Sequence, residues 1–214
     1  MPQKPDPRFL AITAHDLRGA VGVLDGATKE LTRELPQLNG DAAKLTQMMA
    51  RSTQRLLLLG DRLSVLAKLM NGAELEMSEP ADVTALVKES AQRAFSAHAR
   101  RNLKLRIDGG PASAVMNAQA MAGALSELTA LFCSFSQVEL VITVIADANR
   151  AKITFQSDNP SESVARALRD RSATTQANAG IALAEDVIAR HKGSLELSDV
   201  DANAAVILSL PRSP

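Results

Sequence analysis

The chain has 214 residues, and its 24 Lys and Arg residues balance its 24 Asp and Glu residues. Nucleic acids and anionic membranes attract proteins with an excess of positive charge, so we expect neither as a partner. The single cysteine, Cys133, excludes a disulfide framework and a cysteine-based zinc site, and we expect no metal site. Because one cysteine suits a reducing compartment and no apolar stretch has the length of a membrane span, we expect a cytoplasmic protein.

Two long helices are predicted in the first third of the chain. Leucines recur every seven residues in the first helix, at Leu10, Leu17, Leu24 and Leu31, and Pro36 then ends it near residue 35. Asp41 offers an N-cap for the second helix. This helix carries an a/d seam with alternating steps of four and three residues, formed by Leu45, Met49, Ser52, Leu56, Leu59, Leu63, Leu66 and Met70.

These two seams predict how the helices assemble. Two antiparallel helices cannot bury both seams against each other alone, so we expect a second copy of the chain to complete a dimeric four-helix bundle. The alternative is a monomeric hairpin packed on the rest of the chain. The hairpin is expected to form a first domain over residues 1–72.

Residues 73–214 are predicted to form a second domain of the α/β class, with residues 73–110 as its connector. Helices are expected from Val83, after the capping residue Asp82, and at 117–135, 161–170 and 180–191. Strands are expected at 74–77, 103–108, 138–146, 151–156, 194–198 and 205–210, with a loop at 172–179. This order predicts a mixed sheet with helices on one face.

His15 is the residue in the first helix that most suggests chemistry. Helical periodicity places it about opposite the leucine seam, on the solvent face. Gly19, Gly22 and Gly26 follow on the same face, and each costs the helix ~0.5–1 kcal/mol relative to alanine. We interpret these three residues, the glycine strip, as a surface on which another protein docks. The alternatives are a poorly optimised exposed face or the close approach of another helix.

The chemistry available to His15 follows from its exposure. An imidazole with a pKa near 6.5 is partly neutral at pH 7 and can act as a nucleophile. Asp16, the next residue, can orient the ring or accept its proton. For an arbitrary exposed histidine, plain solvation would be the better interpretation, so the sequence around His15 has to decide.

That sequence resembles a known family. Residues 9–18, FLAITAHDLR, resemble the H-box of bacterial sensor histidine kinases. Residues 70–77 followed by 80–83 are similar to the link that these kinases place between their dimerisation hairpin and their ATP-binding domain. Residues 181–198 resemble the helix and strand after their second glycine box. The resemblance runs in order over nearly the whole chain, and it implies a dimeric bundle, a phosphorylatable His15 and a GHKL-type α/β sandwich.

The chain departs from these kinases at the nucleotide site. Leu131 stands where the resemblance places a Mg²⁺-binding asparagine, and leucine has no oxygen for a hard cation. Glu127 stands where a second asparagine is usual. The first glycine box keeps only Asp158, which would read adenine, and the second keeps only Gly180. Because phosphates are cradled by glycine-rich backbone, we describe these four residues as a vestigial nucleotide site and expect no ATP cofactor.

A chain with a phospho-accepting bundle and no ATP site resembles the dimeric histidine phosphotransferases of phosphorelays, of the ChpT and sporulation types. The resemblance implies that a response-regulator receiver domain bearing a phospho-aspartate docks on the bundle and supplies Mg²⁺. His15 then attacks the phosphorus in line, and the phosphate later passes to a second receiver. Asp16 would hold the other ring nitrogen, and Arg18 would face the phosphoryl group.

Further residues of the docking face follow from the mirror symmetry of the hairpin about residue 38. This symmetry places Arg62 at the level of His15 and puts Arg55 and Leu58 beside the glycine strip. Two other functions remain open at this point. One is a divergent but active sensor histidine kinase, and the other is a non-catalytic pseudokinase scaffold that binds a response regulator.

Overall fold

The computed structural model describes residues 7–34, 40–72, 75–77, 80–98, 102–160, 176–200 and 203–212. The chain divides into two compact units, Met1–Glu74 and Leu75–Pro214. The sequence placed this boundary two residues earlier. No helix in these described ranges combines the length and apolarity needed to cross a membrane.

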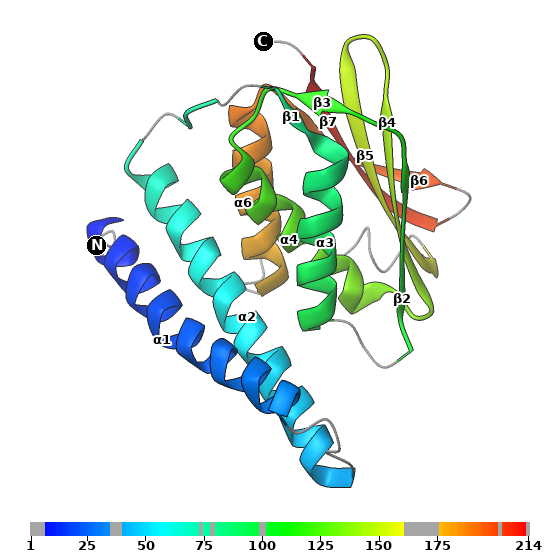
Figure 1. The fold of residues 1–214 in the computed structure, drawn as a ribbon. Helices are drawn as coiled ribbons and strands as arrows, with labels where there is room; N and C mark the ends of the chain where they lie inside the picture. Colours follow the sequence, from blue (N-terminus) through cyan, green and yellow to red (C-terminus); the bar gives the residue numbers. More distant parts are fainter. Residues whose placement is uncertain are drawn as a thin grey trace. The chain divides into compact units, whose positions relative to one another are not determined.

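The first unit is an antiparallel helical hairpin of α1 (Pro7–Glu34) and α2 (Gly40–Met70) (Figure 1). Both helices were predicted within a residue or two of these bounds. Because α2 begins at Gly40, Asp41 lies in its first turn and is not its N-cap. The helix ends at Met70, and Asn71 and Gly72 form the turn that closes it, as predicted. Gly72 has a φ of 65° and donates its N–H to the Leu69 carbonyl at 3.1 Å.

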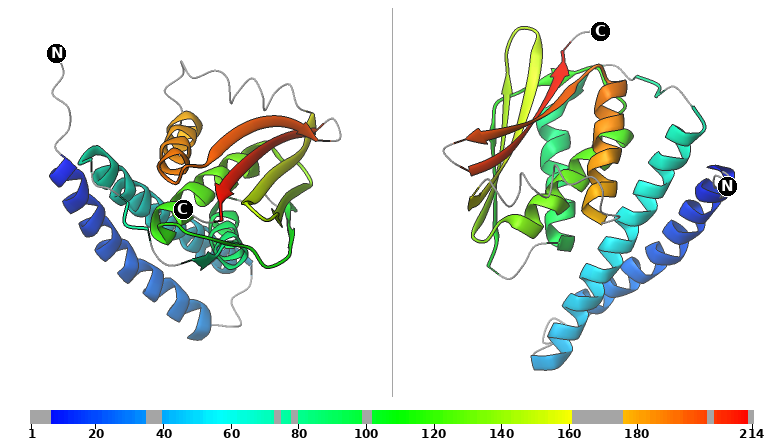
Figure 2. Two further views of the ribbon diagram at one scale, coloured as in Figure 1. Left: turned by 90° about the horizontal axis from the view of Figure 1, so that it is seen from above. Right: turned by 180° about the vertical axis from the view of Figure 1, so that it is seen from behind.

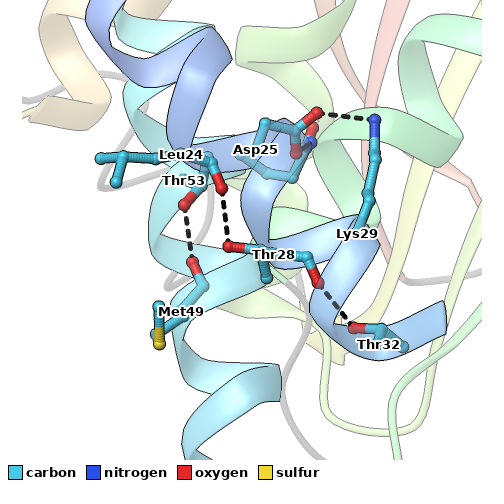
Figure 3. Close-up of polar contacts among 8 residues, drawn as sticks. Leu24, Asp25, Thr28, Lys29, Thr32, Met49 and Thr53 are labelled. Atoms are coloured by element: carbon cyan, nitrogen blue, oxygen red, sulfur yellow. Dashed lines mark hydrogen bonds and ion pairs between the residues drawn. The ribbon is translucent and has the colours of Figure 1, made fainter. Parts of the chain in front are cut away.

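Small residues line the contact between the two helices. Ala14, Val21 and Thr28 are buried at seven-residue intervals along α1. On α2 the matching row is Thr46, Thr53 and Gly60, and Gly60 lies against α1 because a Cβ added there would be 3.6 Å from the Ala14 carbonyl oxygen. The buried hydroxyls bond to their own helices, as Thr28 does to the Leu24 carbonyl at 2.7 Å and Thr53 does to the Met49 carbonyl at 2.9 Å (Figure 3). The helices can therefore approach closely without burying their large side chains.

Most of the predicted leucine seam consequently stays at the surface of the hairpin. Seven of its large apolar side chains are between 37% and 59% exposed: Leu24, Leu31, Leu45, Met49, Leu56, Leu59 and Met70. The row that the two helices bury against each other is the neighbouring one, made of alanine, valine, threonine and glycine.

The second unit is a five-stranded mixed sheet covered by helices on one face (Figures 1 and 2). Its strand order is β2 (Lys104–Gly109), β4 (Glu139–Ala146), β5 (Arg150–Pro160), β7 (Asn203–Pro211) and β6 (Ser194–Val200). The pair β2 and β4 is parallel and the other pairs are antiparallel. The helices are α3 (Val83–His98), α4 (Ala118–Phe135) and α6 (Gln176–Arg190), and a short ladder joins β1 (Ala81–Asp82) to β3 (Ser113–Ala114). The predicted fold class is confirmed.

The core of this unit lies between the sheet and the helices. Alternate residues of β4 and β5 are buried, and Phe155 of β5 packs on Phe132 of α4 with ring centroids 5.9 Å apart. Aliphatic side chains make up most of the rest of the core, as predicted. Cys133 of α4 is buried, and its burial raises the pKa of the thiol to about 12.

Several local predictions differ from the structure. Residues 75–77 are not in a strand, and α6 begins at Gln176 inside the segment expected to be a loop. The strand β5 continues to Pro160, beyond its predicted end at Gln156, with a register shift between these two residues. The helix predicted at 161–170 lies outside the described residues.

Candidate functional site

His15 lies on the exposed face of α1, as predicted. Its side chain is 83% exposed, and its Nδ1 is 3.4 Å from the Asp16 Oδ1. A carboxylate accepts a hydrogen bond, so Asp16 favours the tautomer with the proton on Nδ1. In that tautomer the lone pair is on Nε2.

The glycine strip is open. Gly19, Gly22 and Gly26 are exposed, and apart from their chain neighbours and the adjacent backbone of α1 no described atom lies within 4 Å of a Cβ built at any of them. Packing within the described chain therefore does not require glycine at these positions. One interpretation of the strip was that its glycines let another helix approach closely. Neither helix of the described hairpin makes such an approach to it.

Arg18 turns toward α2. A Cβ added at Gly60 would lie 2.8 Å from the Arg18 Cγ, so the arginine stem lies on the bare backbone of α2. The Arg18 Nη1 is 3.8 Å from the Asp61 Oδ1. The sequence did not single out Gly60 or Asp61, although a glycine in the middle of a helix was the available signal.

The contact at Gly60 also fixes the level of the two helices. It brings residues 60–62 of α2 beside residues 14–18 of α1, so Arg62 lies at the level of His15, as the mirror symmetry predicted. Arg55 is exposed. Leu58 is a correction, because it is buried, with 8% exposure, and cannot belong to an exposed docking face. The symmetry gave its height along α2 but not the side of the helix to which it points.

A polar cluster next to Gly26 was also missed by the sequence analysis. The Gln54 Nε2 of α2 donates a hydrogen bond to the Asp25 Oδ1 of α1 at 2.8 Å. The Lys29 Nζ lies 2.6 Å from the other oxygen of Asp25, whose side chain is only 15% exposed (Figure 3). This cluster joins the two helices along one edge of the glycine strip.

In the second unit, the structure brings two of the four predicted nucleotide-site residues together. Gly180 of α6 faces Glu127 of α4, and a Cβ added to the glycine would overlap the Glu127 Oε2 and lie 3.4 Å from its Cβ. Both residues are buried, and Leu131, one turn along α4, is buried as well. The Glu127 carboxylate therefore occupies the space beside the α6 backbone.

Asp158 has a different environment at the end of β5. Its two carboxylate oxygens accept hydrogen bonds from the backbone N–H groups of Gln137, Val138 and Glu139, at 2.8, 2.6 and 3.4 Å. These residues connect α4 to β4. Asp158 thus fastens the start of β4 to the neighbouring strand.

His191 is structural. It follows the last residue of α6 and is buried, its Nδ1 lies 2.6 Å from the Val187 carbonyl oxygen, and its Nε2 accepts the Asn117 backbone N–H at 2.9 Å. Asn117 is the N-cap of α4, so the ring joins the end of one helix to the start of another. Burial lowers the pKa of the imidazole, which keeps it neutral and able to accept this hydrogen bond.

Comparison with known proteins identifies the fold. No protein-family description matches the chain, and no curated protein does. Solved structures do match. The Acinetobacter baumannii histidine kinase AdeS matches over 92% of this chain and 98% of its own, with 15% identity and a TM-score of 0.56. The fold is histidine-kinase-like.

Two other structures agree. The mycobacterial sensor histidine kinase MprB matches over 64% of this chain and 98% of its own, with 16% identity and a TM-score of 0.55. Full-length ShkA in complex with AMPPNP matches over 97% of this chain and 46% of its own, with 19% identity and a TM-score of 0.56.

A histidine-kinase-like fold raises the question of whether the residues present fit ATP and its Mg²⁺ ion. Leu131 has no oxygen ligand for a cation, and the Asp158 carboxylate is used by three backbone N–H groups. The Glu127 carboxyl group fills the space beside Gly180, where a nucleotide phosphate would need room and backbone N–H groups. These residues do not fit the group, and we derive no chemical step from it.

Proposed function

We propose that the chain is a histidine phosphotransferase of a two-component phosphorelay, which passes phosphate between receiver-domain aspartates through His15 without using ATP. One observation carries the proposal: an 83% exposed imidazole on a helical hairpin, with Asp16 beside its Nδ1, in a histidine-kinase-like chain whose nucleotide-site residues are used internally. His15 has the accessibility that a protein-bound phosphate donor requires.

The proposed step balances without a separate acid or base. The His15 Nε2 lone pair forms a bond to the phosphorus of the receiver's aspartyl phosphate, and the P–O bond to the aspartate breaks. The receiver aspartate leaves as a carboxylate, and the imidazole becomes a phosphorylated imidazolium that keeps its Nδ1 proton. Asp16, 3.4 Å from that nitrogen, stabilises this positive charge. The reverse step with a second receiver completes the relay.

The docking face for the receiver runs from His15 along the glycine strip. Absence of side chains at Gly19, Gly22 and Gly26 lets a partner's backbone approach α1 closely. Arg62 and the exposed Arg55 border this face on α2 and suit the acidic surface around a receiver's phosphorylation site. The receiver supplies Mg²⁺, so the chain itself needs no metal.

We propose that the exposed leucine seam is covered by a second copy of the chain. Leucine and methionine recur along both helices on the same seam and remain 37–59% exposed, while the contact within the hairpin uses small residues. A repeat of this kind in both helices of a hairpin matches the core of a two-fold symmetric four-helix bundle. Cys133 is a free, buried thiol, which suits the reducing environment of the cytoplasm that we propose for the protein.

Active autokinase chemistry is the second candidate, favoured by the match to a ShkA structure that holds AMPPNP. The residues at the nucleotide site argue against it. Leu131 has no oxygen to bind a cation, Glu127 fills the space beside Gly180, and the Asp158 carboxylate is already bonded to backbone N–H groups. A scaffold that binds a receiver without phosphorylation is the third outcome that the experiment must separate.

The test is to incubate the pure protein with radiolabelled ATP, and separately with a receiver domain phosphorylated by its own donor. We expect label on His15 only in the second reaction. His15→Ala should lose the label, and the matched variant His98→Ala, altered at the end of α3, should keep it. Label from ATP alone would show a kinase. Receiver binding that is unaffected by His15→Ala, without label, would show a scaffold.

A further inference from the structure

Arg18 is held in place by α2 through shape as well as charge. Its Cγ and Cδ would be 2.8 and 3.6 Å from a Cβ at Gly60, so any larger residue at this position would displace the arginine stem. The Arg18 and Asp61 side chains are 37% and 29% exposed and their charged atoms are 3.8 Å apart. An ion pair with this separation and this exposure adds little to the free energy of unfolding. Its effect is instead local, because it holds the guanidinium of Arg18 near Asp61.

The position of Arg18 matters because of its place relative to His15. Residues three apart on a helix are neighbours on its surface, so the Cβ atoms of His15 and Arg18 are about 5–6 Å apart. A phosphoryl group on His15 would add about two negative charges and three acceptor oxygens, and a guanidinium is suited to bind such a group. The other charged residues at this level are Asp16 on α1 and Asp61 and Arg62 on α2.

We propose that Gly60 and Asp61 are positioning residues, which hold Arg18 across α2 beside His15 so that its guanidinium can exchange the Asp61 carboxylate for a phosphoryl group on His15. The inference rests on the proposed function for its biological meaning. Asp61 then competes with the phosphoryl group for Arg18, and it sets how strongly the phosphorylated state is stabilised. No covalent chemistry beyond the proposed transfer is involved.

The competition can be measured without a receiver. Potassium phosphoramidate, a small-molecule donor, phosphorylates exposed histidines, and a His98→Gln background leaves His15 as the accessible one, since His191 is buried. The ³¹P chemical shift of phospho-His15, followed against pH, gives the pKa of its phosphoryl group. A nearby guanidinium lowers that pKa because it favours the doubly charged form.

Asp61→Asn should release Arg18 and lower the phosphoryl pKa by about 0.3–0.7 units, a two- to five-fold change that corresponds to a partly exposed ion pair. Arg18→Gln should raise the pKa, and Asp61→Asn should then have no effect in the Arg18→Gln background. Asp41→Asn is the matched control, because it removes the same charge from an exposed ion pair with Lys44 in the first turn of α2.

Gly60→Ala gives an independent test. The added methyl group should displace Arg18 and raise the phosphoryl pKa, whereas Gly110→Ala adds the same group in the other unit, where nothing lies within 4 Å, and should not. An Asp61→Asn shift that persists without Arg18, or a folded Gly60→Ala protein with an unchanged titration, would overturn the positioning role. If these shifts are found but no receiver labels His15, the proposed function fails and the positioning role stands.

Discussion

Replacing Leu24 with alanine should weaken self-association of the chain. Leu24 lies on α1 on the exposed leucine seam and is 50% exposed in the single chain (Figure 3). Full burial of a leucine side chain contributes about 1.5–3 kcal/mol, so the half that a second copy would cover contributes about 1 kcal/mol. In a two-fold symmetric dimer the contact occurs twice and the loss is about 2 kcal/mol, which raises the dissociation constant about 30-fold.

Sedimentation equilibrium over a range of concentrations measures this constant directly. Ile145→Ala is the matched control, because Ile145 is 61% exposed on β4 in the other unit and should leave the constant unchanged. Combining Leu24→Ala with Leu56→Ala on α2 should produce a further loss of similar size if the two leucines act independently. A wild-type protein that stays monomeric, or a Leu24→Ala effect no larger than that of Ile145→Ala, would refute the four-helix bundle.

Three further predictions concern the second unit. Cys133 should resist alkylation at neutral pH until the unit unfolds, because burial raises the pKa of its thiol to about 12; reaction at the rate of a free thiol in native buffer would contradict this. The free energy of unfolding should fall as the pH drops below about 6.5, since the unfolded chain protonates His191 there and the folded chain, whose imidazole pKa is lowered, does not. Urea titrations at pH 7.5 and 5.5 should show a smaller fall for His191→Gln. Asp158→Ala should lower the free energy of unfolding by about 1 kcal/mol, since it removes the acceptor of three backbone N–H groups, and an unchanged urea midpoint would disprove that role.

The helical hairpin shows what periodicity predicts and what it leaves open. Proline at 36 and the seven-residue repeats gave both helices almost to the residue. Periodicity does not say which of two adjacent rows faces the other helix, and in the structure the small row at Ala14 and Val21 does so while Leu24 stays outside. The same ambiguity produced the wrong side for Leu58, because symmetry gives height along a helix but not rotation about it.

Contacts between distant residues account for most of what the sequence could not predict. Asp25 and Gln54 are 29 residues apart, and nothing local to either predicts their hydrogen bond. The start of α6 was missed because residues 172–179 have the composition of a loop. In the structure the helix begins at Gln176, and Gly180 lies inside it and lets the Glu127 side chain approach the backbone. Gln176 and the alanines after it are adequate helix formers, so local propensity did not oppose the longer helix.

Polar groups in the two units are used in opposite ways, and this difference bears on function. A buried polar group without a partner is costly, so the fold supplies partners for those that it buries. The buried His191 ring bonds to backbone groups of its own unit, and the exposed Asp158 carboxylate also accepts backbone N–H groups there. His15 and Asp16 instead remain 83% and 74% exposed, and the His15 Nδ1 lies 3.4 Å from the Asp16 Oδ1. Groups that the fold does not need and does not bury are available to a partner, which is why we assign the chemistry to the hairpin and require the phosphate to arrive on another protein.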